Sequence, residues 1–277
     1  MHIDPFFQVP QHTVATSVGN VDVPIFVQEG DYCIAFFLVR RERLLPLLAS
    51  TELKPSLNIG KYSMIALGMA DFTHCSEDPF RMVAASVPVH RNHGPQPRSI
   101  FKEFFAKQDH RYTGFYTFGG HADNGRMGEI GAEIWGLPKG VGPVGFDLEG
   151  GQVNCDVRCA YTGEDVMSFS GKGGRFLQMD AISYHAFSIN EGNLFRSLIN
   201  NKGQFHLHMP LGYRLRVGSG NQQLAQQLRW LGLDGSRPLI MLCADNYQCR
   251  FHEGAVVQQI STIPRKKPES LQKHLIV

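Results

Sequence analysis

The sequence predicts a mainly β protein of the α+β kind, in which a large curved antiparallel sheet closes into a barrel or cone with a few helices outside it. Two observations carry this prediction: segments with helical periodicity are few, and turn signals are frequent along the chain. The stretches between the turns, such as residues 62–72 and 82–89, are long and rich in small residues, which suits pairing in a curved sheet.

The chain is expected to form one domain with an arm at each end. Its 277 residues suffice for one large core, and no Ser/Thr-rich or Pro-rich linker divides them. Residues 1–29 lack a helical period and predict an extended N-terminal arm with one strand, over 21–27. Residues 30–258 form the predicted β domain, and residues 259–277 a polar, basic tail.

Within the domain the predicted elements follow in order. Continuous apolar runs predict strands, and apolar residues at helical spacing predict helices. The strands are expected at 32–39, 62–72, 82–89, 116–121, 204–209, 238–243 and 246–257, hairpins at 143–170, and helices at 40–49, 99–105 and 221–230.

The balance of charge argues against several classes of partner. Lys and Arg number 27 against 25 Asp and Glu, so the formal charge of +2 gives no reason to expect nucleic acid or an anionic membrane. No run approaches the roughly 18 apolar residues of a membrane span, and the first residues lack a leader pattern, so a cytoplasmic protein is expected. The six scattered cysteines predict reduced thiols, and no histidine or cysteine pair has a third ligand, so no metal is expected.

Residues 131–140 concentrate the chemistry of the chain, and Lys139 is its candidate nucleophile. The apolar neighbours of Lys139 would desolvate its ammonium if the segment is buried, and desolvation lowers a lysine pKa. A shift of roughly 3 units from about 10.4 leaves the amine mostly neutral at pH 7, able to form an imine with a ketone. The alternative is an exposed lysine at the end of a strand.

Period-two alternation predicts that Glu133, Trp135 and Leu137 share one strand face with Lys139. Glu133 then points to the same cavity as the amine, or else is a buried structural carboxylate. His121 ends a strand at two glycines and is either a proton shuttle or a surface turn histidine.

The pattern Glu-x-x-Gly-x-Pro-Lys after a glycine, followed by a strand over 141–146, resembles the active-site segment of the acetoacetate decarboxylase family. Weaker similarity covers residues 30–258, including Ala122-Asp123-Asn124 before the lysine segment. The resemblance implies that family's fold, Lys139 as the imine-forming lysine, no cofactor and a homo-oligomer. It also implies that Tyr247 lies near the pocket and orients the substrate.

The sequence departs from the family pattern at supporting positions. Gly140 stands where the family has a second lysine, and the family's pocket glutamate falls near Arg81 and Met82. A family arginine falls near Gly30. These losses favour an imine enzyme with changed chemistry.

The predicted function is therefore a Schiff-base-forming lyase that acts on a small oxo acid through Lys139, by aldol addition and dehydration or by decarboxylation. The predicted catalytic residues are Lys139, Glu133 and His121. The predicted substrate-binding residues are Trp135, Leu137, Arg81, Met82 and Tyr247. One alternative is an acetoacetate or β-keto acid decarboxylase proper, and another is a non-catalytic small-molecule binding protein with the same pocket.

Overall fold

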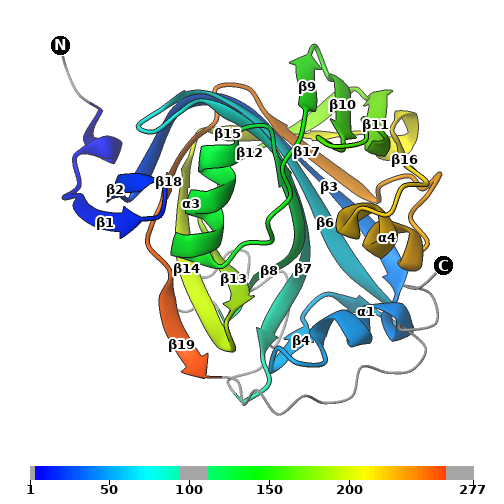
Figure 1. Ribbon diagram of the computed structural model, residues 1–277. Helices are drawn as coiled ribbons and strands as arrows, with labels where there is room; N and C mark the ends of the chain where they lie inside the picture. The colour runs from blue at the N-terminus through cyan, green and yellow to red at the C-terminus, as the bar shows by residue number, and fades with distance from the viewer. Residues whose placement is uncertain (1–3, 94–111, 260–277) are drawn as a thin grey trace.

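The long strands close into a barrel in the computed structural model, which describes residues 4–93 and 112–259 (Figure 1). Seven strands form the wall, each paired with the next and the last with the first: β3 (Ile25–Arg40), β18 (Gln248–Phe251), β14 (Asn193–Lys202), β13 (Tyr184–Asn190), β8 (Thr113–Ala122), β7 (Phe80–Arg91) and β6 (Tyr62–Cys75). The β13–β8 pair is parallel and the other pairs are antiparallel. The predicted mainly β barrel is confirmed.

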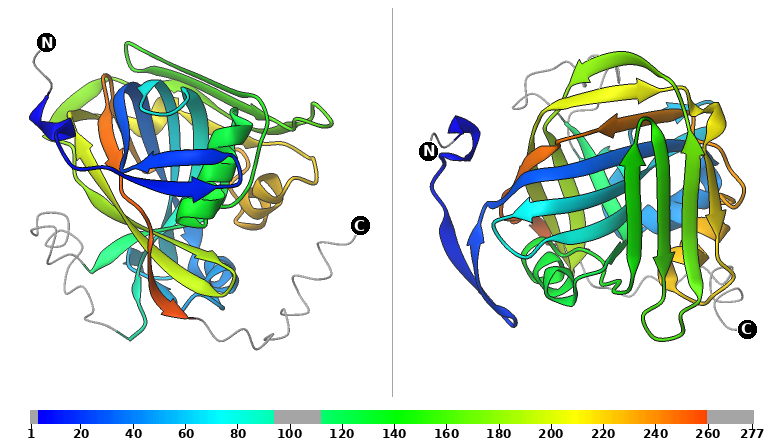
Figure 2. Two further views of the ribbon diagram at one scale, coloured as in Figure 1. Left: turned by 60° about the vertical axis from the view of Figure 1, so that its left-hand side comes forward. Right: turned by 90° about the horizontal axis from the view of Figure 1, so that it is seen from above.

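Strand β3 is long enough to pair with two different strands along one edge. Val27 lies opposite Cys249 of β18, and Ile34 lies opposite Leu242 of β17 (Ile240–Ala244). From β17 the sheet continues outside the barrel through β15 (Gln204–His208) to β12 (Arg175–Asp180). We call β17, β15 and β12 the wing. The right-hand view of Figure 2 shows them beside β3, continuing the curve of the wall.

A second, four-stranded antiparallel sheet covers the outside of the wall. Its order is β16 (Arg214–Val217), β11 (Asp165–Lys172), β10 (Gln152–Arg158) and β9 (Val144–Glu149). The predicted hairpins lie here, and Gly150 and Gly151 take φ values of 55° and 82° in the turn between β9 and β10. The main core fills the space between the sheets, and helices α1 (Arg41–Leu48) and α4 (Gln223–Trp230) contribute leucines to it.

Residues 4–23 lie outside the barrel, on the left in Figure 1. A 3-10 helix η1 (Pro5–Phe7) precedes a hairpin of β1 (His12–Thr16) and β2 (Gly19–Val23), whose valines pack against helix α3 (Gly125–Trp135). The remaining short elements are β4 (Leu53–Pro55), β5 (Asn58–Ile59), η3 (Pro210–Gly212) and β19 (Ala255–Gln259). The helix predicted at 99–105 and residues 260–277 of the predicted tail lie outside the described residues.

Within the described ranges, no helix combines the length and the apolar character that crossing a membrane requires.

The strand predicted through Glu133 is wrong, because α3 (Gly125–Trp135) occupies this stretch. Asn124 caps its first turn by accepting a hydrogen bond from the Met127 amide at 3.2 Å. Gly136 ends it in the left-handed conformation with φ of 65°, and the Leu137 amide donates back to Gly131 at 3.1 Å. The sequence carried both signals, an Asn before and a Gly after an apolar helical repeat.

Candidate active site

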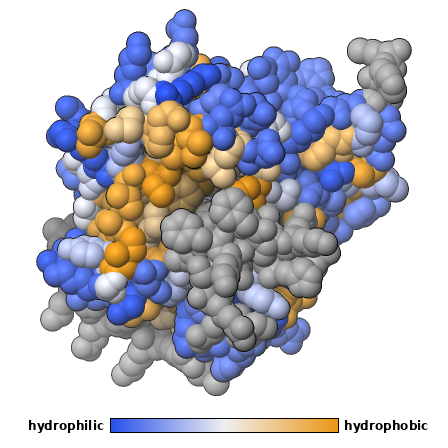
Figure 3. Space-filling view, turned by 180° about the vertical axis from the view of Figure 1, so that it is seen from behind, coloured by the Kyte–Doolittle hydropathy of each residue, from blue (hydrophilic) through white to orange (hydrophobic). Residues whose placement is uncertain are grey.

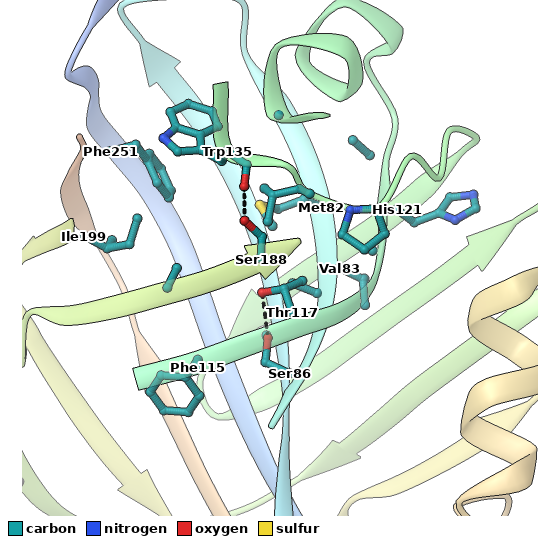
Figure 4. A pocket seen from close by; sticks show the side chains of 18 of the residues that line it. Met82, Val83, Ser86, Phe115, Thr117, His121, Trp135, Ser188, Ile199 and Phe251 are labelled. Carbon is teal, nitrogen blue, oxygen red and sulfur yellow. Dashed lines mark hydrogen bonds between the residues drawn. The ribbon is translucent and has the colours of Figure 1, made fainter. Parts of the chain in front are cut away.

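The inner face of the barrel wall encloses a cavity of about 150 Å³. An apolar cavity of about this size holds a molecule such as benzene. Alternate residues of the wall strands line it, and α3 closes one end with Met127, Gly131 and Trp135. Figure 4 shows side chains from several strands converging there with the indole of Trp135.

No lysine, arginine, aspartate or glutamate of the described residues lines this cavity. Its polar side chains are hydroxyls and one imidazole: Tyr32, Tyr184, Tyr247, Ser86, Thr117, Ser188, Ser197 and His121. A bound carboxylate would therefore lose water without gaining a cationic partner, which is costly. The cavity suits a neutral ligand, or an acid whose charge is lost during reaction.

Several of these hydroxyls have partners within the protein. Ser86 and Thr117 lie 3.1 Å apart across β7 and β8, and Ser188 donates to the carbonyl of Trp135 (Figure 4). The hydroxyl of Tyr247 donates to Oδ1 of Asn201 at 2.6 Å.

The tyrosines of the cavity are neutral. Burial raises the pKa of Tyr32, Tyr184 and Tyr247 above the usual value of a phenol. The rings of Tyr32 and Tyr247 stack with centroids 4.8 Å apart. These phenols are therefore hydrogen-bonding groups fixed in a packed aromatic wall.

Lys139 lies at the edge of the cavity and points away from it. Its neighbours Pro138 and Gly140 line the cavity, whereas its own side chain is 56% exposed and pairs with Glu129 of α3 at 2.5 Å. The hydrogen bond that the ammonium of Lys139 donates to Glu129 raises the pKa of Lys139. The prediction of a desolvated Lys139 amine with a lowered pKa is therefore wrong. Helix α3 turns the segment so that the side chain of Lys139 faces water and the carboxylate of Glu129.

Gly140 lies against β8 so closely that it has no room for a side chain. A Cβ on Gly140 would be 2.1 Å from the carbonyl oxygen of Gly120 and 2.7 Å from Nδ1 of His121. The Ala122 amide donates to the Gly140 carbonyl at 2.9 Å, and the Gly142 amide donates to the Ala122 carbonyl at 3.1 Å. These bonds fix the segment that carries Lys139.

His121 is part of this contact and is only 8% exposed. Burial lowers its pKa, so the imidazole is mostly neutral at pH 7. It therefore does not supply the cation that a second lysine supplies in the family that the sequence resembles.

Two predicted site residues lie away from the cavity. Glu133 is on the exposed side of α3, where it accepts a hydrogen bond from the Ser17 amide at 2.9 Å, and this bonding lowers its pKa. Arg81 points outward from β7 and pairs with Asp71 at 2.8 Å. Both positions follow from geometry: Glu133 is on the outer face of a helix, and Arg81 alternates with its neighbour Met82 along a strand.

The other predicted residues, Trp135, Leu137, Met82, Tyr247 and His121, line the cavity together. Tyr32, Tyr184 and Ser188 also line it, and the sequence analysis did not single them out. The only signal for them was strand alternation, which does not say which face of a strand points inward.

Comparison with solved structures shows the fold of the acetoacetate decarboxylases. Acetoacetate decarboxylase from Legionella pneumophila matches with a TM-score of 0.62 at 12% identity, covering 92% of this chain and 94% of that one. The enduracididine biosynthesis enzyme MppR complexed with pyruvate matches with a TM-score of 0.57 at 12% identity, covering 86% and 91%.

An acetoacetate decarboxylase-like enzyme from Sphingomonas wittichii RW1 matches with a TM-score of 0.54 at 12% identity, covering 86% of this chain and 95% of that one. No protein-family model and no curated protein sequence matches the chain. The shared feature is therefore the fold, which the sequence resemblance had predicted.

Proposed function

We propose that this chain is a lyase-type enzyme that decarboxylates a 3-oxo acid through an imine on Lys139. The observation that best supports the proposal is an uncharged cavity whose wall includes both neighbours of a lysine, Pro138 and Gly140. The fold shared with acetoacetate decarboxylase is consistent with it. Lys139 remains the nucleophile, as the sequence predicts. Of the two reactions that the sequence left open, decarboxylation is proposed in place of aldol addition and dehydration.

The reaction balances without a cofactor. The neutral amine of Lys139 adds to the ketone, the adduct takes up a proton from solvent, and water leaves to give an iminium ion. The bond to the carboxylate carbon breaks, carbon dioxide departs, and the electron pair moves to the iminium nitrogen as an enamine forms. A proton adds to the enamine carbon to give an iminium ion again, and water then hydrolyses it to release a methyl ketone, the free lysine and a proton.

The uncharged lining favours decarboxylation over aldol addition. In an aldol reaction of a 2-oxo acid the carboxylate persists, so it would need a cation in the cavity throughout. In decarboxylation the carboxylate is consumed, and its poor solvation in an apolar site favours the uncharged product. A neutral ketone product also suits a wall of phenols and apolar side chains.

Lys139 must leave Glu129 before it can attack. Both partners are partly exposed, with 56% of the lysine side chain and 38% of the glutamate side chain accessible. An exposed ion pair contributes little to stability, so breaking it is not a large barrier. Inside the apolar cavity the ammonium would lose its hydration, and its pKa would fall. Lys139 thus has two positions in this proposal: an outer one, in which it is protonated and paired with Glu129, and an inner one in the cavity, in which the amine is neutral and reactive.

Replacing Glu129 by glutamine is expected to shift imine formation to lower pH. The glutamate raises the pKa of Lys139, and attack needs the unprotonated amine, so its removal increases the neutral fraction at any pH below that pKa. We expect trapping by borohydride at pH 8 to be several-fold faster in Glu129→Gln. Glu149→Gln, at the exposed end of β9, is the control and should leave the pH profile unchanged. An identical profile in both variants would show that the ion pair does not control the amine.

The proposed function is tested by borohydride trapping with acetoacetate and, separately, with pyruvate, followed by intact mass and peptide mapping. We expect an adduct on Lys139 with acetoacetate, together with release of carbon dioxide. An adduct with pyruvate alone would replace decarboxylation by aldol chemistry.

A non-catalytic binding protein is the second candidate, favoured by the outward position of Lys139 and its pairing with Glu129. In that case the cavity would bind a neutral small molecule without a covalent step. Saturable binding of a methyl ketone with no trapped adduct from either acid would select this candidate.

A further inference from the structure

The face of the sheet that lines the cavity continues beyond the barrel onto the wing. Residues directly opposite each other in paired strands share one face of the sheet. One such row runs across six strands: Leu177, Leu207, Leu242, Ile34, Gly68 and Ala84. Its last three members line the cavity, and its first three belong to the wing.

A neighbouring row repeats this arrangement. Ile240 of the wing lies opposite Phe36, Phe36 lies opposite Ala66, and Ala66 lines the cavity. Phe36 and Ala66 form a buried cluster against which Ile240, Leu242 and Ile34 pack. Apolar contact is therefore continuous from the cavity wall to the wing.

The two faces of the wing differ in what covers them. Met241 and Cys243 belong to the core beneath the four-stranded sheet. On the opposite face, Leu207, Leu242 and Ile240 are only partly buried, and Leu177 is 56% exposed. Seen from behind, the molecule shows apolar side chains gathered on its surface (Figure 3).

We infer that this face of the wing binds the hydrocarbon tail of the ligand whose ketone lies in the cavity. The same rows of apolar residues line the cavity and this face of the wing, so one ligand can contact both surfaces. The row residues of β12, β15 and β17 carry no charge, as the cavity residues carry none. The row from Ile34 to Leu177 crosses three strand spacings, about 14 Å, which exceeds what a short keto acid would contact.

This inference rests on the proposed function and specifies its substrate: a 3-oxo acid with a long alkyl chain, giving a long-chain methyl ketone. The reaction class that supplies such an acid is one that builds or degrades acyl chains. A small acid such as acetoacetate would fill the cavity alone and leave the wing unused.

The test compares the affinities of two methyl ketones, pentan-2-one and tridecan-2-one, for the full chain, measured by calorimetry and by the fluorescence of Trp135 in the cavity wall. Each buried methylene contributes about 0.8 kcal/mol, or roughly a fourfold gain in affinity. We expect tridecan-2-one to bind at least about a hundredfold more tightly, which needs only about four of its extra methylenes to be buried.

Leu177→Glu places a charge on the exposed end of the row and is expected to reduce this preference at least tenfold, with pentan-2-one binding unchanged. Leu45→Glu, at an exposed leucine of α1, is the matched control and should bind both ketones as the parent chain does. Leu177 is already exposed, so the variant is expected to fold, and a series of ketones of intermediate length in the parent chain gives an independent readout.

Equal affinity for both ketones, or a preference unaffected by Leu177→Glu, would overturn the inference. So would an oligomer of the parent chain that dissociates in Leu177→Glu, because the wing would then be an interface with a second copy. Trapping of acetoacetate on Lys139 without a chain-length preference would retain the proposed function and remove the tail site. A chain-length preference without trapping would retain the tail site and remove the proposed imine chemistry.

Discussion

Replacing Lys139 by alanine is expected to abolish imine formation and decarboxylation while leaving the fold intact. The side chain is largely exposed and pairs only at the surface, so its removal opens no cavity in the core. Loss of the residue that forms the covalent intermediate should reduce turnover by about a thousandfold or more. The measurements are carbon dioxide release, adduct mass after borohydride treatment and thermal unfolding of the same preparation.

One further variant separates the charge of the amine from its nucleophilicity, and a second serves as a control. Lys139→Arg keeps a cation for Glu129 but cannot form an imine, so it should be as inactive as the alanine variant. Lys172→Ala removes an exposed lysine of β11 and should retain full activity. Turnover by Lys139→Ala at the level of the parent chain would refute the imine mechanism at this residue.

The barrel could be predicted because its signals are local. Long apolar stretches and frequent turns identify strands wherever the strands later pair. The helix α3 was missed although Asn124 and Gly136 mark both of its ends, because the alternation of Glu133, Trp135 and Leu137 suggested a strand. Over so few residues the two periodicities overlap, and the capping residues decide between them.

The direction of Lys139 could not be predicted in this way. It depends on where Gly136 ends the helix and on the close contact between Gly140 and the carbonyl of Gly120. It also depends on Glu129 of α3, whose carboxylate pairs with the ammonium of Lys139. These contacts join segments that no sequence period connects. Arg81 illustrates the same limit on a smaller scale, since a shift of one strand position separates an outward residue from the cavity residue Met82.

Restoring a second lysine by Gly140→Lys is expected to damage the protein and not to activate it. The Cβ alone would approach the Gly120 carbonyl oxygen to 2.1 Å, and that oxygen is backbone within β8. Even Gly140→Ala should lower the free energy of unfolding by about 1–3 kcal/mol, the usual cost of overpacking, and the lysine variant by more. Chemical denaturation measures the loss, and borohydride trapping should become slower in both variants because the segment that carries Lys139 must move.

Gly125→Ala is the control for this prediction, because it adds the same methyl group on α3, where a Cβ would lie 4.0 Å from Val141. That is an ordinary contact, and alanine favours the helix, so stability should stay the same or rise slightly. A stable Gly140→Lys protein with faster trapping would contradict the packing argument. It would show that the segment can move away from Gly120. It would also show that the new cation lowers the pKa of the Lys139 amine, because a nearby like charge disfavours the protonated form. The expected failure of this substitution instead means that an enzyme with Gly140 must activate its lysine by burial alone.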